Sequence, residues 1–320
     1  MNDLVVGGAG FIGSQLCDAL LAKGDNVVCL DNLMRGNLAN ISQALKNKHF
    51  SFIKEDATNE RALEEILKER KIDFVYHLAA NSDIQASAND PSIEFYATCS
   101  TTWSVLSSMR KSGVKKFFFA SSSAVYGEMR QDQPFNELSE MNPISYYGSA
   151  KMASEAFISS FTYMNGFDSL IFRFPNVVGK RLTHGVVFDF ICRLKDNPNE
   201  LIVLGDGTQS KPYISADDLI NAILLFSEKN KGKNVFEIGV RGSTSVRYVA
   251  ENAIKEMGIR NCKIIYGNSK SGWKGDVSHF LFDDSKIQSF GWKATMNSDE
   301  AVLYAIRETI KSYANLDHRK

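Results

Sequence analysis

The stretch Val5-Val6-Gly7-Gly8-Ala9-Gly10-Phe11-Ile12-Gly13 decides the fold of this 320-residue chain. Residues 4–6 form a short apolar run that predicts a buried strand, and residues 15–23 carry apolar side chains at helical spacing. Gly7 permits a tight turn, Gly10 lets a pyrophosphate approach the backbone, and Gly13 lets the helix pack close to its strand. The stretch therefore predicts a phosphate cradle at a helix N-terminus, although a glycine motif alone also fits an ordinary strand–helix turn.

A carboxylate after the next strand makes the prediction stronger. Residues 26–30 form a second apolar run that ends at Asp31, where a carboxylate can accept hydrogen bonds from the ribose hydroxyls of adenosine. Because a carboxylate at this position repels the extra phosphate of NADP, the sequence favours NAD. The nearby Arg35 could pair with that phosphate, so this residue also fits NADP. We therefore expect a dinucleotide-binding domain with NAD as its cofactor.

Strands and helices continue to alternate along the chain. The further predicted strands are residues 50–54, 73–78, 114–120 and 170–174. The further predicted helices are residues 61–69, 91–111 and 145–164. This alternation predicts the α/β class, with a Rossmann-type, doubly wound parallel sheet.

The alternation weakens after residue 174, which indicates a smaller, mixed α/β substrate-binding domain. Residues 176–212 are expected to be loops around one helix at 186–195, whereas a helix at 216–228 and a strand at 234–238 return to the main sheet. The predicted domains are an NAD-binding domain of residues 1–175 and about 213–242, and a nucleotide-sugar-binding domain of residues 176–212 and 243–320.

The composition argues against several classes of partner. The formal net charge of zero gives no reason to expect a nucleic acid, and no apolar run is long enough to span a membrane. The first strand begins so early that no room is left for a signal peptide. The five cysteines are scattered and form no cluster of metal ligands. We expect a cytoplasmic protein with reduced thiols and no metal.

The chemical centre is predicted where the strand at 114–120 runs into a serine turn, Ser121-Ser122-Ser123. Further along, Tyr147 and Lys151 are four residues apart and lie on one helix face. A free tyrosine has a pKa of about 10, and a nearby ammonium together with a positive nicotinamide ring favours the phenolate. Bringing that pKa near 7 requires roughly 4 kcal/mol. A tyrosine and a lysine at this spacing also occur as ordinary surface pairs, but here they follow a dinucleotide motif and a serine turn.

With these motifs, nearly the whole chain resembles the extended short-chain dehydrogenase/reductases, specifically the nucleotide-sugar epimerase/dehydratase family of the UDP-glucose 4-epimerase type. The resemblance rests on residues 7–13, Asp31-Asn32-Leu33, His77-Leu78-Ala79-Ala80, residues 121–127, Tyr147 with Lys151, residues 173–179, residues 203–207, Gly275-Asp276 and Leu281-Phe282-Asp283. It implies a UDP-linked or similar nucleotide sugar as the partner, and a homodimer that forms through the helices at 91–111 and 145–164, whose apolar residues also fit a core.

The resemblance implies roles for individual residues. Tyr147 would take the proton from a sugar hydroxyl, Lys151 would hold the nicotinamide ribose, and Ser122 would hydrogen-bond the reacting hydroxyl. The expected NAD-binding residues are Gly7, Gly10, Phe11, Ile12, Asp31, Asn32, Leu33, Arg35, Asp56, Ala57, Leu78, Ala79, Ala80, Tyr147 and Lys151. The expected substrate-binding residues are Ser82, Asp83, Ser122, Ser123, Asn176 and Lys211. Asp56 and Asp83 also fit simple helix caps.

Ser123 and Ala124 help to choose the reaction. In the dehydratases of the family an acidic pair occupies these positions, because elimination of water needs a proton donor and a base. This chain has no carboxyl group there, so the resemblance implies epimerisation at C4 by transient oxidation. The alternatives are an NAD(P)H-dependent ketosugar reductase or an epimerase acting at another carbon. A non-catalytic NAD-binding module is disfavoured because Ser122, Tyr147 and Lys151 are all present.

Several positions depart from the family pattern. Thr98 stands where many relatives have asparagine, and Lys211 stands where an arginine that binds the diphosphate is common. Trp273-Lys274 replaces a second arginine. Lysine keeps the charge but loses the planar fork, so the grip on the diphosphate is expected to differ. The bulky Phe280 suggests a plain hexose rather than an N-acetylated sugar.

Overall fold

The computed structural model describes residues 1–81, 83–129, 133–269, 277 and 279–317, and its contacts divide the chain into two compact units. The first unit comprises Met1–Gly127, Glu140–Arg173 and Ile220–Phe236, and the second comprises Glu128–Ser139, Phe174–Leu219 and Glu237–Lys320. This division differs from the predicted domains at three places. The segment Glu128–Ser139 and residues 174–175 join the second unit, and the return to the first unit is shorter than residues 213–242.

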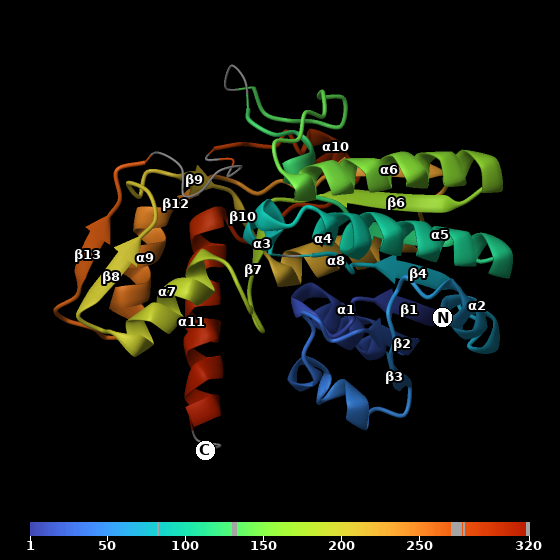
Figure 1. Ribbon diagram of the computed structural model, residues 1–320, viewed down its shortest axis with the longest axis horizontal. Helices are drawn as coiled ribbons and strands as arrows, with labels where there is room; N and C mark the ends of the chain where they lie inside the picture. Colours follow the sequence, from blue (N-terminus) through green and yellow to red (C-terminus); the bar gives the residue numbers. More distant parts are fainter. Residues whose placement is uncertain (82, 130–132, 270–276, 278, 318–320) are drawn as a thin grey trace. The chain divides into compact units, whose positions relative to one another are not determined.

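A seven-stranded parallel sheet forms the centre of the first unit, with the strand order β11-β6-β5-β4-β1-β2-β3 (Figure 1). Its strands are β1 (Asn2–Val6), β2 (Asn26–Asp31), β3 (Phe50–Lys54), β4 (Phe74–His77), β5 (Lys116–Ala120), β6 (Asp168–Arg173) and β11 (Lys233–Glu237). The order reverses between β1 and β4, which is where parallel sheets of this kind bind their ligands. The predicted Rossmann-type, doubly wound sheet is confirmed.

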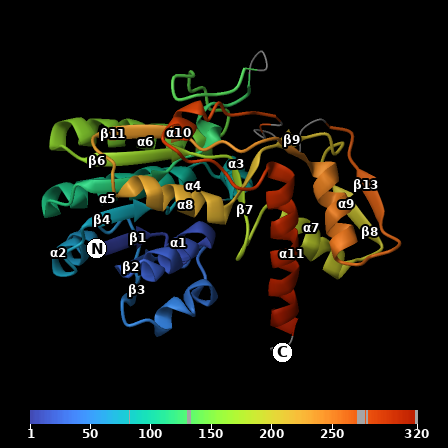
Figure 2. The same cartoon turned by 180° about the vertical axis from the view of Figure 1, so that it is seen from behind.

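Helices cover both faces of this sheet. Those on one face are α2 (Glu60–Glu69), α5 (Thr101–Ser112) and α6 (Tyr146–Asn165), and those on the other are α1 (Phe11–Ala22) and α8 (Ala216–Ser227) (Figures 1 and 2). Because the inner strands are buried on both faces, each of them carries a continuous apolar run rather than an alternating pattern. The run in β5 illustrates this. Phe117 and Phe119 lie in the core cluster beneath α5 and α6, while Phe118 packs edge-to-face on Phe172 at 5.3 Å between ring centroids.

The long helix predicted at residues 91–111 is interrupted. It consists of α4 (Ser92–Glu94), a π-helical turn (Phe95–Ser100) and α5, and a shorter helix, α3 (Ile84–Asn89), precedes it. The hydroxyl of Thr101 donates to the carbonyl of Ala97 at 2.9 Å, and that of Thr102 donates to the carbonyl of Thr98 at 2.7 Å. Such hydroxyl-to-carbonyl bonds compete with the regular helical ladder, which the helical periodicity of the sequence does not reveal.

Short 3-10 turns lie in the connecting segments of the first unit, at Leu38–Ile41, Ala44–Lys46 and Ser123–Val125. Among the described residues, no helix is long and apolar enough to cross a bilayer.

The second unit contains three small two-stranded sheets. These pair β7 (Asn176–Val178) with β10 (Tyr213–Ser215), β8 (Glu200–Val203) with β13 (Lys263–Tyr266), and β9 (Ser210–Lys211) with β12 (Thr244–Ser245). Its helices are α7 (Val186–Asp196), α9 (Val246–Glu256), α10 (Ser285–Ser289) and α11 (Ser298–Asp317). The helix predicted at 186–195 is confirmed, but the expectation of loops around it was wrong, because strands of two to four residues are too short to show a periodicity.

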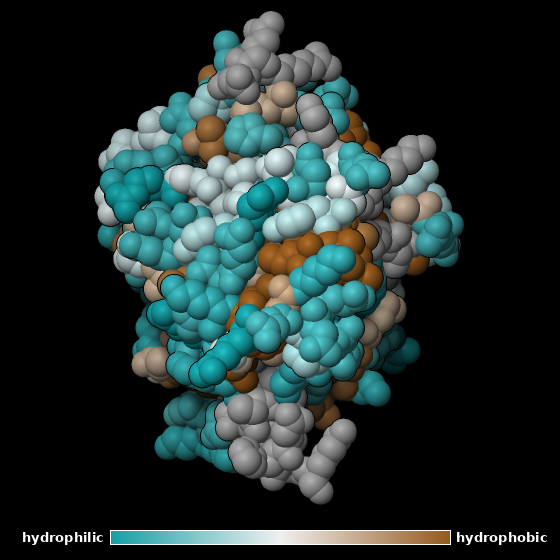
Figure 3. Space-filling view, turned by 90° about the vertical axis from the view of Figure 1, so that its left-hand side faces the viewer, coloured by the Kyte–Doolittle hydropathy of each residue, from teal (hydrophilic) through white to brown (hydrophobic). Residues whose placement is uncertain are grey.

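Apolar side chains gather on the face of this unit that carries β8 and β13 (Figure 3). Ile202 and Leu204 are each about half exposed there.

Candidate active site

The glycine turn between β1 and α1 is closely packed, and its packing explains the spacing of its glycines. Gly7 has a φ of 81°, which favours glycine, and a Cβ placed on it would lie 2.7 Å from the backbone nitrogen of Ala79. A Cβ on Gly13 would collide with the carbonyl oxygen of Gly7. Gly10 is the N-cap of α1 and has no side chain to occupy the N–H groups of the first turn. The turn therefore fits a dinucleotide pyrophosphate at this helix N-terminus.

Asp31, at the end of β2, is hydrogen-bonded to the same turn. Its carboxylate accepts hydrogen bonds from the backbone nitrogens of Ala9 at 2.9 Å and Leu33 at 2.8 Å. Burial raises the pKa of Asp31 despite these two bonds. Leu33 has a φ of 62°, so the bond from its own nitrogen helps to hold a strained conformation. Each carboxylate oxygen keeps a further lone pair for the ribose hydroxyls expected there.

The residues expected around the adenosine are linked to one another. Asn32 donates to the carboxylate of Asp56 at 2.8 Å, and Thr58 donates to it from both its backbone nitrogen and its hydroxyl. Burial opposes ionisation of Asp56, but the bonds from Thr58 and Asn32 outweigh it and lower its pKa. Asp56 is not the cap of α2, since that position belongs to Asn59. Its alternative interpretation as a helix cap was therefore wrong.

Other predicted cofactor residues line the same end of the sheet. Leu78, Ala79 and Ala80 follow β4 and are partly exposed, while Phe11 and Ala57 are buried and Ile12 is half-buried. Arg35 forms an ion pair of 2.8 Å with Asp83, so a residue expected at the adenosine is joined to one expected at the sugar.

Ser122 and Tyr147 come together because the start of α6 packs on the serine turn. Ser145 caps α6 by accepting from the backbone nitrogen of Gly148 at 3.1 Å. A Cβ on Gly148 would collide with the carbonyl oxygen of Ala124, so glycine allows this close approach. The Ser122 side chain lies close enough to Tyr147 to lower the pKa of its phenol.

Lys151 lies one turn further along α6 and is 2% exposed. Its ammonium donates to the carbonyl oxygen of Ala120, at the end of β5, over 2.7 Å. It also lies 4.7 Å from the ring centroid of Phe119 and 5.7 Å from that of Tyr147. The predicted set of Ser122, Tyr147 and Lys151 thus occupies one place in the first unit.

The electrostatics of this set differ from the expectation of a phenolate. Burial raises the pKa of Tyr147 above its ordinary value, the Ser122 side chain lowers it, and Glu94 raises it further. Burial lowers the pKa of Lys151 to about 8, and Glu94 and Glu155 oppose that change. The protein alone therefore keeps Tyr147 protonated, since desolvation outweighs the nearby ammonium.

Buried polar residues that the motifs did not single out support α6. Glu155 accepts from Arg173 at 2.6 Å and from the hydroxyl of Ser121 at 2.5 Å, and Arg173 also donates to the hydroxyl of Tyr126 at 2.5 Å. Glu155 follows Lys151 by one helical turn. This spacing could have indicated that Glu155 lies on the same helix face as Lys151. For Glu94 the sequence offers no such indication, because its segment is predicted to be an ordinary helix over residues 91–111.

His77 takes no part in this set. It is buried, and burial lowers its pKa to about 3, so the ring is neutral. Its Nε2 lies 3.1 Å from the hydroxyl of Thr102. This agrees with a packed histidine at a strand end.

The expected substrate residues fall in different places. Asp83 and Ser123 belong to the first unit, whereas Asn176, at the start of β7, and Lys211, in β9, belong to the second. Phe280 is 4% exposed and packs against Phe282 at 5.5 Å between ring centroids. Ser82, Trp273 and Lys274 lie outside the described residues.

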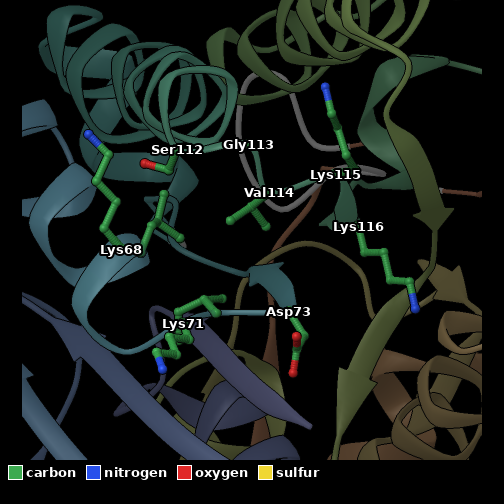
Figure 4. Close-up of a pocket in the computed structure, with 10 residues that line it drawn as sticks. Lys68, Lys71, Asp73, Ser112, Gly113, Val114, Lys115 and Lys116 are labelled. Carbon is green, nitrogen blue, oxygen red and sulfur yellow. The ribbon is translucent and has the colours of Figure 1, made fainter.

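An open hollow of about 590 Å³ lies at the opposite edge of the sheet, before β4 and β5 begin. Four lysines are among the residues that line it, and Figure 4 shows that the ammonium groups of Lys68, Lys71, Lys115 and Lys116 point in different directions. They do not converge on one point, so the hollow offers no concentrated cation cluster for an anion.

Comparisons with known proteins agree with this site. The NAD dependent epimerase/dehydratase family matches residues 4–239. The chain is 32% identical to a putative UDP-glucose 4-epimerase of Methanocaldococcus jannaschii, over 93% of this chain and 95% of that protein. It is 28% identical to the dTDP-D-glucose 4,6-dehydratase of Mus musculus, over 98% of this chain and 89% of that protein.

Solved structures give the same result. The UDP-glucose 4-epimerase of Thermotoga maritima, determined with UDP-glucose, is similar with a TM-score of 0.89 and 30% identity, over 98% of this chain and all of that one. The UDP-glucose 4-epimerase of Thermus thermophilus, determined in complex with NAD, has a TM-score of 0.86 and 28% identity, over 97% of this chain and 99% of that one.

Proposed function

Because the chain belongs to the NAD-dependent epimerase/dehydratase family and NAD is its cofactor, we propose that it is a nucleotide-sugar 4-epimerase. The observation that carries this proposal is the nearness of Ser122 to Tyr147 and of Tyr147 to the buried Lys151, with Ser123 and Ala124 in place of an acidic pair. We infer a UDP-linked hexose as the substrate, which two relatives bind or act on by name.

In this proposal Tyr147 removes the proton from the C4 hydroxyl of the sugar and later returns it. Ser122 hydrogen-bonds the reacting hydroxyl, and Lys151 stabilises the negative charge of the phenolate and holds the nicotinamide ribose. The chemistry that NAD supplies when bound is reversible two-electron oxidation of a sugar carbon. Asn176 and Lys211 are proposed to bind the diphosphate. Rotation of the 4-ketose between oxidation and reduction inverts C4.

The dehydratase relatives make elimination of water the main competing reaction. Elimination needs a proton donor and a base near C5 and C6, and in this chain Ser123 and Ala124 carry no carboxyl group. A ketosugar reductase would use the same three residues but would consume reduced cofactor in each turnover.

The test is to incubate purified protein, without added cofactor, with UDP-, dTDP-, GDP- and CDP-sugars and to follow the products by NMR. Inversion at C4 without net NADH formation is the expected result. A 4-keto-6-deoxy product would instead make the protein a dehydratase, and ketosugar-dependent oxidation of NADPH would make it a reductase. Tyr147→Phe should lower turnover by roughly 10²- to 10⁴-fold and keep NAD bound.

We further propose a homodimer that forms through α5 and α6. Trp103 is 47% exposed and packs edge-to-face on Phe157 and Phe161, so these helices carry a continuous aromatic surface. Light scattering should give twice the monomer mass, and Trp103→Glu should reduce it to one copy. Leu138→Glu, at a position of the second unit that is 95% exposed, is the control. A wild-type monomer at micromolar concentration contradicts the proposal.

We also propose that the protein works in the cytoplasm. All five cysteines are free and three of them are buried, which suits a reducing compartment. A fluorescent fusion tests this, and retention outside the cytoplasm would contradict it.

A further inference from the structure

One buried carboxylate close to the catalytic set has no role in the reaction proposed above. Glu94, at the end of α4, is only 2% exposed. Asn81 donates to its Oε1 at 2.8 Å, and Thr98 donates to its Oε2 at 3.1 Å. Within the described part of the chain, no lysine or arginine forms an ion pair with Glu94. A buried carboxylate that receives only neutral donors needs compensation from another charge.

The backbone around Glu94 is held against the helix that carries Tyr147 and Lys151. Glu94 directly precedes the π-helical turn Phe95–Ser100, and such turns often occur at functional sites. Cys99 in this turn contacts the carbonyl oxygen of Ala150 at 3.6 Å, next to Lys151. Thr98, in the same turn, donates to the Glu94 carboxylate.

The contacts of Asn81 fix the other side of the carboxylate. Its side-chain nitrogen donates both to Glu94 and, at 2.7 Å, to the backbone carbonyl of Asp83. Asn81 follows Leu78, Ala79 and Ala80, which come directly after β4 at the edge of the sheet where the cofactor is expected. Glu94 is therefore anchored from two elements, and its charge is fixed in place.

Glu94 acts electrostatically on both members of the catalytic pair. Glu94 raises the pKa of Tyr147, as burial also does. It also raises the pKa of Lys151, which burial lowers. The other charged or titratable groups that act on Lys151 are Glu155, Cys99 and the neutral His77. Glu155 already has Arg173 as its partner. Glu94 is thus the carboxylate of this group without an arginine or lysine ion pair among the described residues.

We propose that Glu94 is a positioning residue of the active site, whose anchored carboxylate supplies the counter-charge that keeps Lys151 protonated beside Tyr147. The proposal rests on the proposed function, because it concerns the same pair of residues. It assigns Asn81 and Thr98 the task of holding that charge in place. A lysine so retained as ammonium can stabilise the phenolate that forms when Tyr147 gives up its proton.

The decisive variant is Glu94→Gln, which has nearly the same shape, keeps hydrogen-bonding atoms for Asn81 and Thr98, and removes only the charge. The first measurement is the ionisation of Lys151 in the NAD-containing protein, followed through the ¹³Cε shifts of labelled lysines, with Lys151→Met to assign its signal. We expect the midpoint of Lys151 to fall by roughly one pH unit in Glu94→Gln. Glu65→Gln, which removes an exposed charge of α2, should leave it unchanged.

The second measurement is the pH dependence of kcat/KM, which reports the ionisations of the free enzyme. In Glu94→Gln, the acidic and the alkaline limb of the kcat/KM profile should both move to lower pH. Glu94→Asp keeps the charge, so it should restore the positions of both limbs at least in part. Activity that falls while both limbs and the Lys151 midpoint stay in place would mean a merely structural role and would overturn the proposal. If the wild type turns over no sugar, the proposed function fails, while the Lys151 midpoint still decides the role of Glu94.

Discussion

Replacing Asp3 with asparagine should stabilise the protein, and increasingly so as the pH rises. Asp3 is the second residue of β1 and is fully buried, with its backbone paired to Val27 on one side and Phe74 on the other. Neither carboxyl oxygen has a hydrogen-bond partner among the described residues. Burial, with Asp25 next in importance, raises the pKa of Asp3 from 3.8 to about 7.

The direction in which stability changes with pH follows from the raised pKa of Asp3. Between pH 3.8 and 7 the folded state binds a proton that the unfolded state has released, so the wild type loses stability as the pH rises through this interval. Each pH unit of the interval corresponds to about 1.4 kcal/mol. Between pH 5 and pH 8 the wild type should lose about 3 kcal/mol relative to Asp3→Asn, an upper limit that relaxation or water near the carboxylate reduces. Above pH 7 the difference should be constant.

The assay is the difference in Tm between variant and wild type, measured with the same saturating NAD at several pH values. The difference should grow by roughly 5 °C from pH 5 to pH 8. Asp196→Asn, at an exposed position near the end of α7, is the control and should show no such growth. A difference for Asp3→Asn that stays constant over this range would refute the reasoning, because it would mean that Asp3 ionises alike in the folded and unfolded states.

Two further substitutions test the packing that positions the site. If NAD copurifies with the wild type, Gly13→Ala should abolish this copurification, because the new Cβ collides with the backbone at Gly7. Ultraviolet absorbance measures the NAD content of both proteins, and an equal content would contradict the packing argument. Arg173→Met should destabilise the protein by about 3–5 kcal/mol because it leaves the Glu155 carboxylate buried and unpaired. Adding Glu155→Gln should recover much of that loss in denaturant unfolding, whereas no recovery would mean that the charge is not the cause.

Much of the first unit could be predicted from its sequence because its signals are local. The apolar runs of β1, β2, β4, β5 and β6 are continuous since both faces of the sheet are covered there, and a continuous run is visible without knowing what covers it. The glycine spacing reflects collisions within the same turn, as for Gly13 and Gly7. The helical spacing of Tyr147 and Lys151 likewise fixes their common face.

The electrostatics of the site could not be predicted in this way. Tyr147 and Lys151 suggested a lowered tyrosine pKa, but the structure buries both and places Glu94 close enough to raise the pKa of each. Glu94 is distant in sequence from this pair, and nothing in its neighbourhood indicates burial. The same reason applies to the partnership of Arg173 with Glu155 and to the short strands of the second unit, whose pairing joins distant residues.

The sequence by itself therefore determined the fold class, the cofactor and the pairing of Tyr147 with Lys151, because turn geometry and helical spacing act over a few residues. The resemblance to the family added Ser122 as a candidate catalytic residue. Only the tertiary structure decided which of these residues are desolvated and which charges act on them. Desolvation and Coulomb interactions depend on distances in space, so the protonation of Lys151 and the counter-charge from Glu94 emerge only once β4, the π-helical turn and α6 are packed together.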